Sequence, residues 1–112
     1  MGATMAFTNV TDQNFDAEVV QASSTLPVLV DFWAPWCEPC KMIRAEIQRA
    51  AEAFKDQVEV VRVDVDAFHS LAEKYDIMAI PTLLFFKDGK PVKRIIGYAS
   101  EEEIRKFLAT LV

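Results

Sequence analysis

The chain has two cysteines, Cys37 and Cys40, separated by two residues in the segment WAPWCEPC. Such a C-x-x-C pair can exchange disulfides with other proteins, supply half of a metal site, or form a structural disulfide. In a reducing compartment the pair is more often catalytic or metal-binding than permanently oxidised. A structural zinc ion takes four ligands, and the chain adds only one histidine, His69, so the sequence argues against an internal zinc site. Thiol–disulfide exchange is the favoured chemistry, and no metal is expected.

The cysteines follow a predicted buried strand and open a predicted helix. The apolar run 28–33 is typical of a strand covered on both faces, at a central and parallel position of a sheet. Residues 39–54 then carry an apolar stripe at helical spacing. The stripe consists of Ile43, Ile47, Ala50, Ala51 and Phe54. Because strand-to-helix junctions are normally exposed, we expect Trp36 and Cys37 to face solvent.

A helix N-terminus favours a thiolate, which is the form of cysteine that attacks a disulfide. Unpaired N–H groups and the positive end of the helix dipole both stabilise an anion there. Cys37 is nearest the loop and is the predicted nucleophile. Cys40, about one turn into the helix, is the predicted resolving thiol that breaks the mixed disulfide. Pro39 stiffens the loop between them, since its missing N–H would have been unpaired in the first turn.

Asp31 is the one charged residue of the predicted buried strand. Burial should raise the pKa of its carboxyl, as a proton acceptor working near neutral pH requires. We therefore consider it as the group that takes the proton of Cys40 during resolution, directly or through water. The alternative from the residues alone is a carboxylate that is solvated at a sheet opening or held in a salt bridge.

The rest of the pattern predicts one domain over residues 7–112, after a flexible extension over residues 1–6. Its first elements are a short strand at 7–10 and a helix from Thr11-Asp12 to about 23. After the strand and helix around the cysteines come a strand at 58–65, a helix at 67–75 and a strand at 82–86. A hairpin turn at Asp88-Gly89 leads to a strand at 92–96, and a capping box at 100–103 opens the final helix. This order predicts an α/β fold with a mixed sheet between helices.

Composition excludes other classes of function. The net charge of −5 and the pI near 4.8 argue against nucleic-acid binding, which usually needs a basic face. The start of the chain lacks the features of a secretory signal, and no apolar run reaches the length of a membrane span. We therefore expect a cytoplasmic protein that binds neither nucleic acid nor membrane.

The segment 28–41, with its two tryptophans and both cysteines, and the later Ile80-Pro81-Thr82 resemble the thioredoxin family. The resemblance covers nearly the whole chain from Phe7. It implies a thioredoxin fold, with a central mixed sheet of four to five strands sandwiched between four helices. It further implies a cytoplasmic protein-disulfide reductase that carries electrons and maintains redox balance, is recharged by a thioredoxin reductase, is monomeric, and needs no cofactor.

The resemblance also assigns roles to residues outside the motif. It implies a cis bond before Pro81, with the backbone preceding this proline pairing with an extended substrate. The matching docking surface for protein substrates consists of Trp36, Pro39, Ile80, Pro81, Gly97 and Tyr98. It implies that Trp33 supports the active-site loop from beneath, and it favours the catalytic role of Asp31.

Three residues depart from the usual family pattern. Glu38 replaces a glycine between the cysteines, Ala45 replaces a proline that kinks the helix, and Arg62 replaces a lysine that accompanies the buried aspartate. The Glu38 charge should repel a thiolate at Cys37 and raise its pKa, and it should lower the reduction potential if this repulsion dominates. An Arg62 guanidinium that reaches Asp31 would hold the carboxylate ionised and oppose the raised pKa. Ala45 should give a straighter helix.

Two other functions stay open from the sequence. An oxidase or isomerase on the same fold usually carries a histidine between the cysteines, where this chain has Glu38-Pro39. A binding or chaperone-like module would use the same fold with little turnover of its cysteines. The motif favours disulfide reduction over both.

Overall fold

The computed structural model describes residues 7–112, so the predicted extension 1–6 lies outside the described residues. Within this part of the chain, five strands form one sheet in the order β1-β3-β2-β4-β5. They are β1 (Thr8–Asn9), β2 (Val28–Trp33), β3 (Glu59–Asp64), β4 (Thr82–Lys87) and β5 (Lys90–Ile96). β1, β3 and β2 run parallel, whereas β4 pairs antiparallel with both β2 and β5. The predicted mixed sheet is confirmed, and β2 is its central strand.

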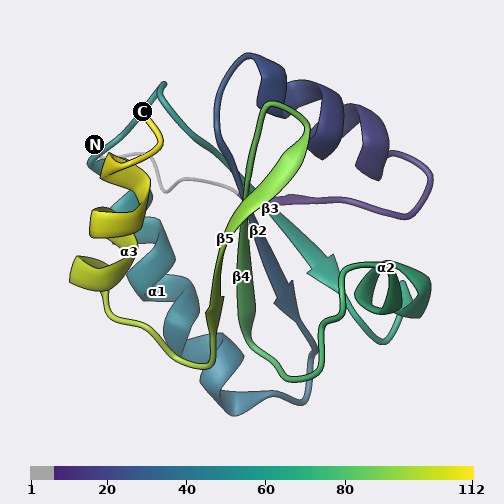
Figure 1. The fold of residues 1–112 in the computed structure, drawn as a ribbon. Helices are drawn as coiled ribbons and strands as arrows, with labels where there is room; N and C mark the ends of the chain where they lie inside the picture. The colour runs from purple at the N-terminus through teal and green to yellow at the C-terminus, as the bar shows by residue number, and fades with distance from the viewer. Residues whose placement is uncertain (1–6) are drawn as a thin grey trace.

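Helices cover both faces of the sheet, as Figure 1 shows with the sheet seen nearly edge-on. α1 (Glu38–Glu52) and α3 (Glu101–Ala109) lie on one side. α2 (His69–Lys74) and the helical segment η1 (Asp16–Gln21) with η2 (Ala22–Ser24) lie on the other. No helix within residues 7–112 is long and apolar enough to cross a membrane.

Side chains of β2 point alternately to the two faces of the sheet, and this explains why the sequence shows a continuous apolar run. Leu29 packs in the cluster beneath α1 and α3, while Val28, Val30 and Phe32 pack in the cluster on the opposite face. Successive side chains of a strand point to opposite faces, and here both faces are covered. Asp31 is thus buried on the α1 side with no solvent exposure.

Two helices begin later than the sequence predicts. The Thr11 side chain accepts hydrogen bonds from the N–H groups of Gln13 and Asn14, so residues 12–14 form a turn before the π-helix η1. The Asp64 carboxylate accepts from the N–H groups of Asp66 and Ala67, which holds a turn where helix was expected and delays α2 to His69. In both places side-chain hydrogen bonds to the backbone replace a helical turn.

The other predicted elements are close to those observed. Asp88 and Gly89 have positive φ of 53° and 82°, as a two-residue hairpin turn requires. The capping box at Ser100 and Glu103 is present, with each side chain accepting from the other residue's N–H. α1 ends at Glu52, two residues before Phe54, which still packs against the core.

Candidate active site

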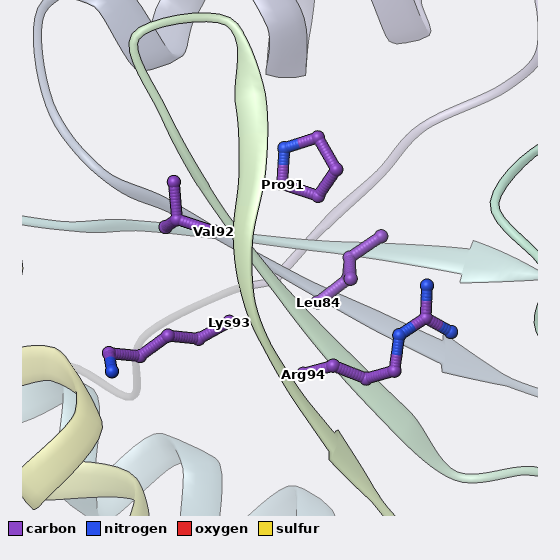
Figure 2. A pocket seen from close by; sticks show the side chains of 5 residues that line it. All are labelled: Leu84, Pro91, Val92, Lys93 and Arg94. Atoms are coloured by element: carbon purple, nitrogen blue, oxygen red, sulfur yellow. The ribbon is translucent and has the colours of Figure 1, made fainter.

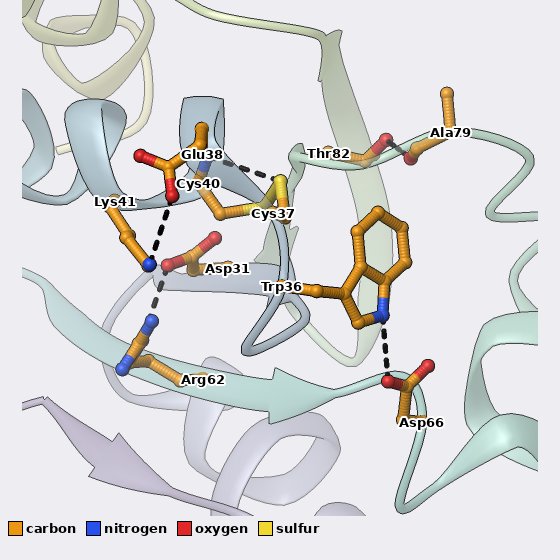
Figure 3. Close-up of a disulfide and its surroundings, with 10 residues drawn as sticks. All are labelled: Asp31, Trp36, Cys37, Glu38, Cys40, Lys41, Arg62, Asp66, Ala79 and Thr82. Carbon is orange, nitrogen blue, oxygen red and sulfur yellow. Dashed lines mark hydrogen bonds and ion pairs between the residues drawn. A yellow bond between two sulfur atoms is a disulfide. The ribbon is translucent and has the colours of Figure 1, made fainter.

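Cys37 and Cys40 form a disulfide at the N-terminus of α1, with their Cα atoms 5.3 Å apart (Figure 3). β2 ends at Trp33, a short loop follows, and Cys37 is the N-cap of the helix. Its Sγ accepts a hydrogen bond from the backbone N–H of Cys40 at 3.2 Å. The same donor would stabilise negative charge on this sulfur in the reduced protein, since a thiolate accepts such bonds better than a thiol.

The exposure of the loop differs from the sequence prediction at one residue. Trp36 is 66% exposed, as expected, but Cys37 is only 3% exposed, and Cys40 is fully buried. Both cysteines pack with Ala34 in a small cluster whose flanks are Trp33, Val65 and Ile80. The expectation that Cys37 faces solvent is wrong because side chains after β3 and before β4 cover the loop. Cys37 is still the more accessible of the two cysteines.

Asp31 lies below the disulfide in Figure 3, and its register neighbour on the parallel strand β3 is Arg62. The Nε of Arg62 donates to Oδ2 of Asp31 at 3.4 Å, while Oδ1 has no hydrogen-bond partner among the described residues. The guanidinium also stacks on the Trp33 ring, 3.9 Å from its centroid. Arg62 is therefore held between an aromatic face and a buried carboxylate.

Burial raises the pKa of Asp31 from 3.8 to about 6, and the opposing effect of the Arg62 charge is smaller. Burial likewise lowers the pKa of Arg62, with Asp31 opposing it. The contact that the sequence left open is thus present, yet it does not cancel the raised pKa of the carboxyl. The buried Nε1 of Trp33 has no hydrogen-bond partner among the described residues, and the ring packs against the cysteine cluster.

Removing the charge of Arg62 should raise the pKa of Asp31 above about 6, because the guanidinium is the main group that lowers it. The Arg62→Met variant removes the guanidinium and its charge while it keeps an unbranched apolar side chain beside Trp33. The titration of Asp31, followed by NMR of the carboxyl carbon, measures the effect. A midpoint that stays near 6 or falls would show that the two groups do not interact.

Glu38 extends into solvent, with 78% of its side chain exposed, and its carboxylate pairs with the Lys41 Nζ at 3.1 Å. Solvent and this partner both weaken its repulsion of a Cys37 thiolate. In reduced Glu38→Gly, we expect the pH midpoint for alkylation of Cys37 by iodoacetamide to fall by less than about 0.5, from a single charge pair in water. An equal or higher midpoint would contradict the predicted repulsion.

Within the predicted docking surface, the Ile80-Pro81 bond is cis, which confirms the expected isomer. Ile80 packs against the cysteine cluster, and the N–H of Gly97 donates to the carbonyl of Pro81 at 2.8 Å. Tyr98 and Trp36 are exposed, whereas the Pro81 side chain is buried. Pro39, the second residue of α1, is also exposed.

Sequence reasoning missed three residues near this surface. Asp66 accepts a hydrogen bond from the indole Nε1 of Trp36 at 2.8 Å, which fixes the position of this exposed ring. Met78 and Ile96 are exposed large apolar side chains. Met78 lies two residues before Ile80 in the sequence, and Ile96 directly precedes Gly97. A signal for Asp66 was present, because it follows β3 at the edge where the parallel strand β2 also ends.

The open hollow in Figure 2, of about 260 Å³, lies along β4 and β5 and contains none of the predicted site residues. It is lined by Leu84 and by residues 91–94. Among residues 7–112, no group of three or more His, Cys, Asp or Glu side chains could hold a metal ion.

A disulfide at the junction of a central strand and a helix, above a buried carboxylate and beside a cis proline, defines a dithiol–disulfide redox protein. Comparison with known families matches residues 6–110 to the thioredoxin family. Similar curated relatives include the thioredoxins of Staphylococcus aureus strains Mu50 and MW2. Each is 41% identical over 104 residues, which cover 93% of this chain and 96% of the relative. The chain belongs to the thioredoxin family, and its Cys37–Cys40 pair makes it a thiol–disulfide oxidoreductase of the protein-disulfide reductase type.

Proposed function

We propose that the chain carries electrons to disulfides of cytoplasmic proteins, with Cys37 as the nucleophile and Cys40 as the resolving thiol. The observation that carries this proposal is the hydrogen bond from the Cys40 N–H to the Cys37 sulfur at the start of α1. This donor and the helix dipole favour a thiolate on Cys37 rather than on Cys40. The greater exposure of Cys37 supports the same assignment.

The reaction transfers two electrons from the protein to its substrate. The Cys37 thiolate attacks one substrate sulfur, forming a mixed disulfide and releasing the other substrate sulfur as a thiolate. Cys40 then loses its proton and attacks the Cys37 sulfur, which forms the protein disulfide and releases the second substrate sulfur. The substrate disulfide is thereby reduced to two thiols, and the protein dithiol is oxidised to the disulfide that the structure contains.

In this proposal Asp31 accepts the proton of Cys40. A base with a pKa of about 6 is mostly ionised at neutral pH and is stronger than an ordinary carboxylate. Its Oδ1 has no hydrogen-bond partner among residues 7–112, so this oxygen is available to receive a proton directly or through a water molecule. Arg62 holds the other oxygen and Trp33 supports Arg62, which makes both of them positioning residues.

Substrates dock on the surface formed by Trp36, Pro39, Ile80, Pro81, Gly97 and Tyr98. Its exposed aromatic side chains and buried proline suit an extended backbone laid against residues 79–81. A thioredoxin reductase, which must also reach the disulfide, regenerates the dithiol through the same surface. The protein acts as a monomer in this cycle and needs no bound cofactor.

Reduction of insulin by dithiothreitol tests the proposal. Catalytic amounts of the protein should accelerate precipitation of the insulin B chain well above the rate with dithiothreitol alone. A protein that binds insulin without accelerating its reduction would instead be a binding or chaperone-like module on the same fold. The rate relative to the protein-free reaction decides between these two functions.

A further inference from the structure

We propose that Glu38 is a specificity-determining residue and that the preferred substrates carry Lys or Arg beside their reactive cysteine. This inference rests on the proposed function, because it concerns the substrate that Cys37 attacks. Glu38 is the residue that directly follows Cys37, and it projects 78% of its side chain into solvent. A substrate sulfur bonded to Cys37 would bring its neighbouring residues within reach of this carboxylate.

A second carboxylate lies on the other side of the disulfide. Figure 3 shows Glu38 and Asp66 on opposite sides of the cysteines. Asp66 is exposed and is held in place by the Trp36 indole, whose Nε1 donates to its Oδ2 at 2.8 Å. A substrate that reaches the disulfide therefore meets two exposed carboxylates around it, which complements positive charge beside a substrate cysteine.

Lys41 is the one exposed cation among the residues of Figure 3. It pairs with Glu38 at 3.1 Å, one helical turn further along α1, and both side chains are largely exposed. Exposed pairs of this kind are weak and exchange partners readily, so a substrate guanidinium can replace Lys41 beside Glu38. Asp31 and Arg62 are buried and paired with each other, and they present no charge to an arriving substrate.

Two synthetic peptides test the preference. Each is closed by one internal disulfide, and they differ only in the residues flanking the cysteines, which are Arg in one and Glu in the other. The reduced protein is mixed with each peptide, and the initial rate of peptide reduction is measured by chromatography. At an ionic strength of about 0.02 M we expect the Arg peptide to react about tenfold faster, and this ratio should fall towards one at about 0.5 M.

Glu38→Gln should lower the ratio of the two rates by about threefold, because it removes the attraction of Arg and the repulsion of Glu, each the effect of one charge pair at about 12 Å in water. The ratio cancels any change in the reactivity of Cys37 itself, which affects both peptides equally. Lys41→Gln should raise the ratio, because it frees Glu38. Glu52→Gln is the matched control: it removes the same charge at the far end of α1, about 20 Å away, and should leave the ratio unchanged.

Equal rates for the two peptides would overturn the preference while leaving the reductase function intact. A ratio that falls equally in Glu38→Gln and Glu52→Gln would also overturn it, because the effect would then come from net charge alone. Failure to reduce either peptide would overturn both the preference and the proposed function.

Discussion

Replacing Cys37 with serine should abolish disulfide reduction, with a loss of rate on the order of 10³-fold or more. A serine hydroxyl does not ionise near neutral pH, so the helix N-terminus has no anion to stabilise. Cys40 cannot take over the attack, because it is fully buried and lies one turn inside α1. The insulin assay, with its rate compared with that of dithiothreitol alone, measures the loss.

Cys40→Ser should fail in a different way. Its Cys37 can still attack a disulfide once, but nothing resolves the mixed disulfide that results. Incubation with a disulfide peptide should therefore yield a stable covalent adduct, which mass spectrometry of a protease digest places on Cys37. An adduct of Cys37→Ser on Cys40 under the same conditions would show that the two roles are reversed.

The serine variants need a matched reference for folding. Both lack the disulfide and its contribution to stability, so wild type with a reduced dithiol is the proper comparison. Equal urea midpoints for the reduced wild type and the two variants would show that lost activity reflects lost chemistry. Activity of Cys37→Ser near the wild-type rate would exclude Cys37 as the nucleophile.

The core of the site follows from local sequence patterns. The apolar run 28–33 and the apolar stripe of the next helix both reflect burial, because the buried faces of a strand or helix determine the spacing of its apolar residues. Together they placed Cys37 and Cys40 at the junction where the structure has them. The cis bond before Pro81 had no such local signal and was inferred only from the family resemblance.

Properties that depend on distant segments were not predictable. Whether Cys37 is exposed depends on its packing with Val65 and Ile80, which are distant from it in the sequence. The Asp31–Arg62 contact was left open because it depends on the register of β2 against β3. The π-helical form of η1 was also missed, since apolar spacing alone does not distinguish a short π-helix from an α-helix.

Asp31→Asn should stabilise the protein at pH 7 by about 1 to 3 kcal/mol. The carboxyl has a pKa of about 6 in the folded protein against 3.8 when unperturbed, so the unfolded state ionises first as pH rises. Wild-type stability should accordingly fall by roughly 3 kcal/mol between about pH 3 and pH 7, most of it between about pH 4 and 6, and then stay level. Asparagine avoids this loss, although Arg62 then lacks its charged partner, which reduces the gain.

Urea unfolding of both oxidised proteins at about pH 3 and pH 7 measures this effect. At about pH 3, below both pKa values, the carboxyl is mostly protonated in the folded and unfolded wild type alike, so the difference between the proteins should nearly vanish there. A gain of equal size at both pH values would assign the stabilisation to packing or hydrogen bonding rather than to ionisation.

The same substitution should slow catalysis while it stabilises the fold, as expected where a buried charge serves function. Asparagine cannot accept the Cys40 proton, so we expect reduction of insulin at pH 7 to slow by about tenfold, below the usual range for a general base because thiols ionise readily. Wild-type activity should rise with pH through about 6 as Asp31 ionises, and Asp31→Asn should lose that rise. Comparing the pH profiles of the two proteins distinguishes a proton-accepting Asp31 from a purely structural one. Loss of a purely structural aspartate would change the rate without flattening its dependence on pH. An unchanged profile would remove Asp31 from the proton transfer and leave it as a destabilising partner of Arg62.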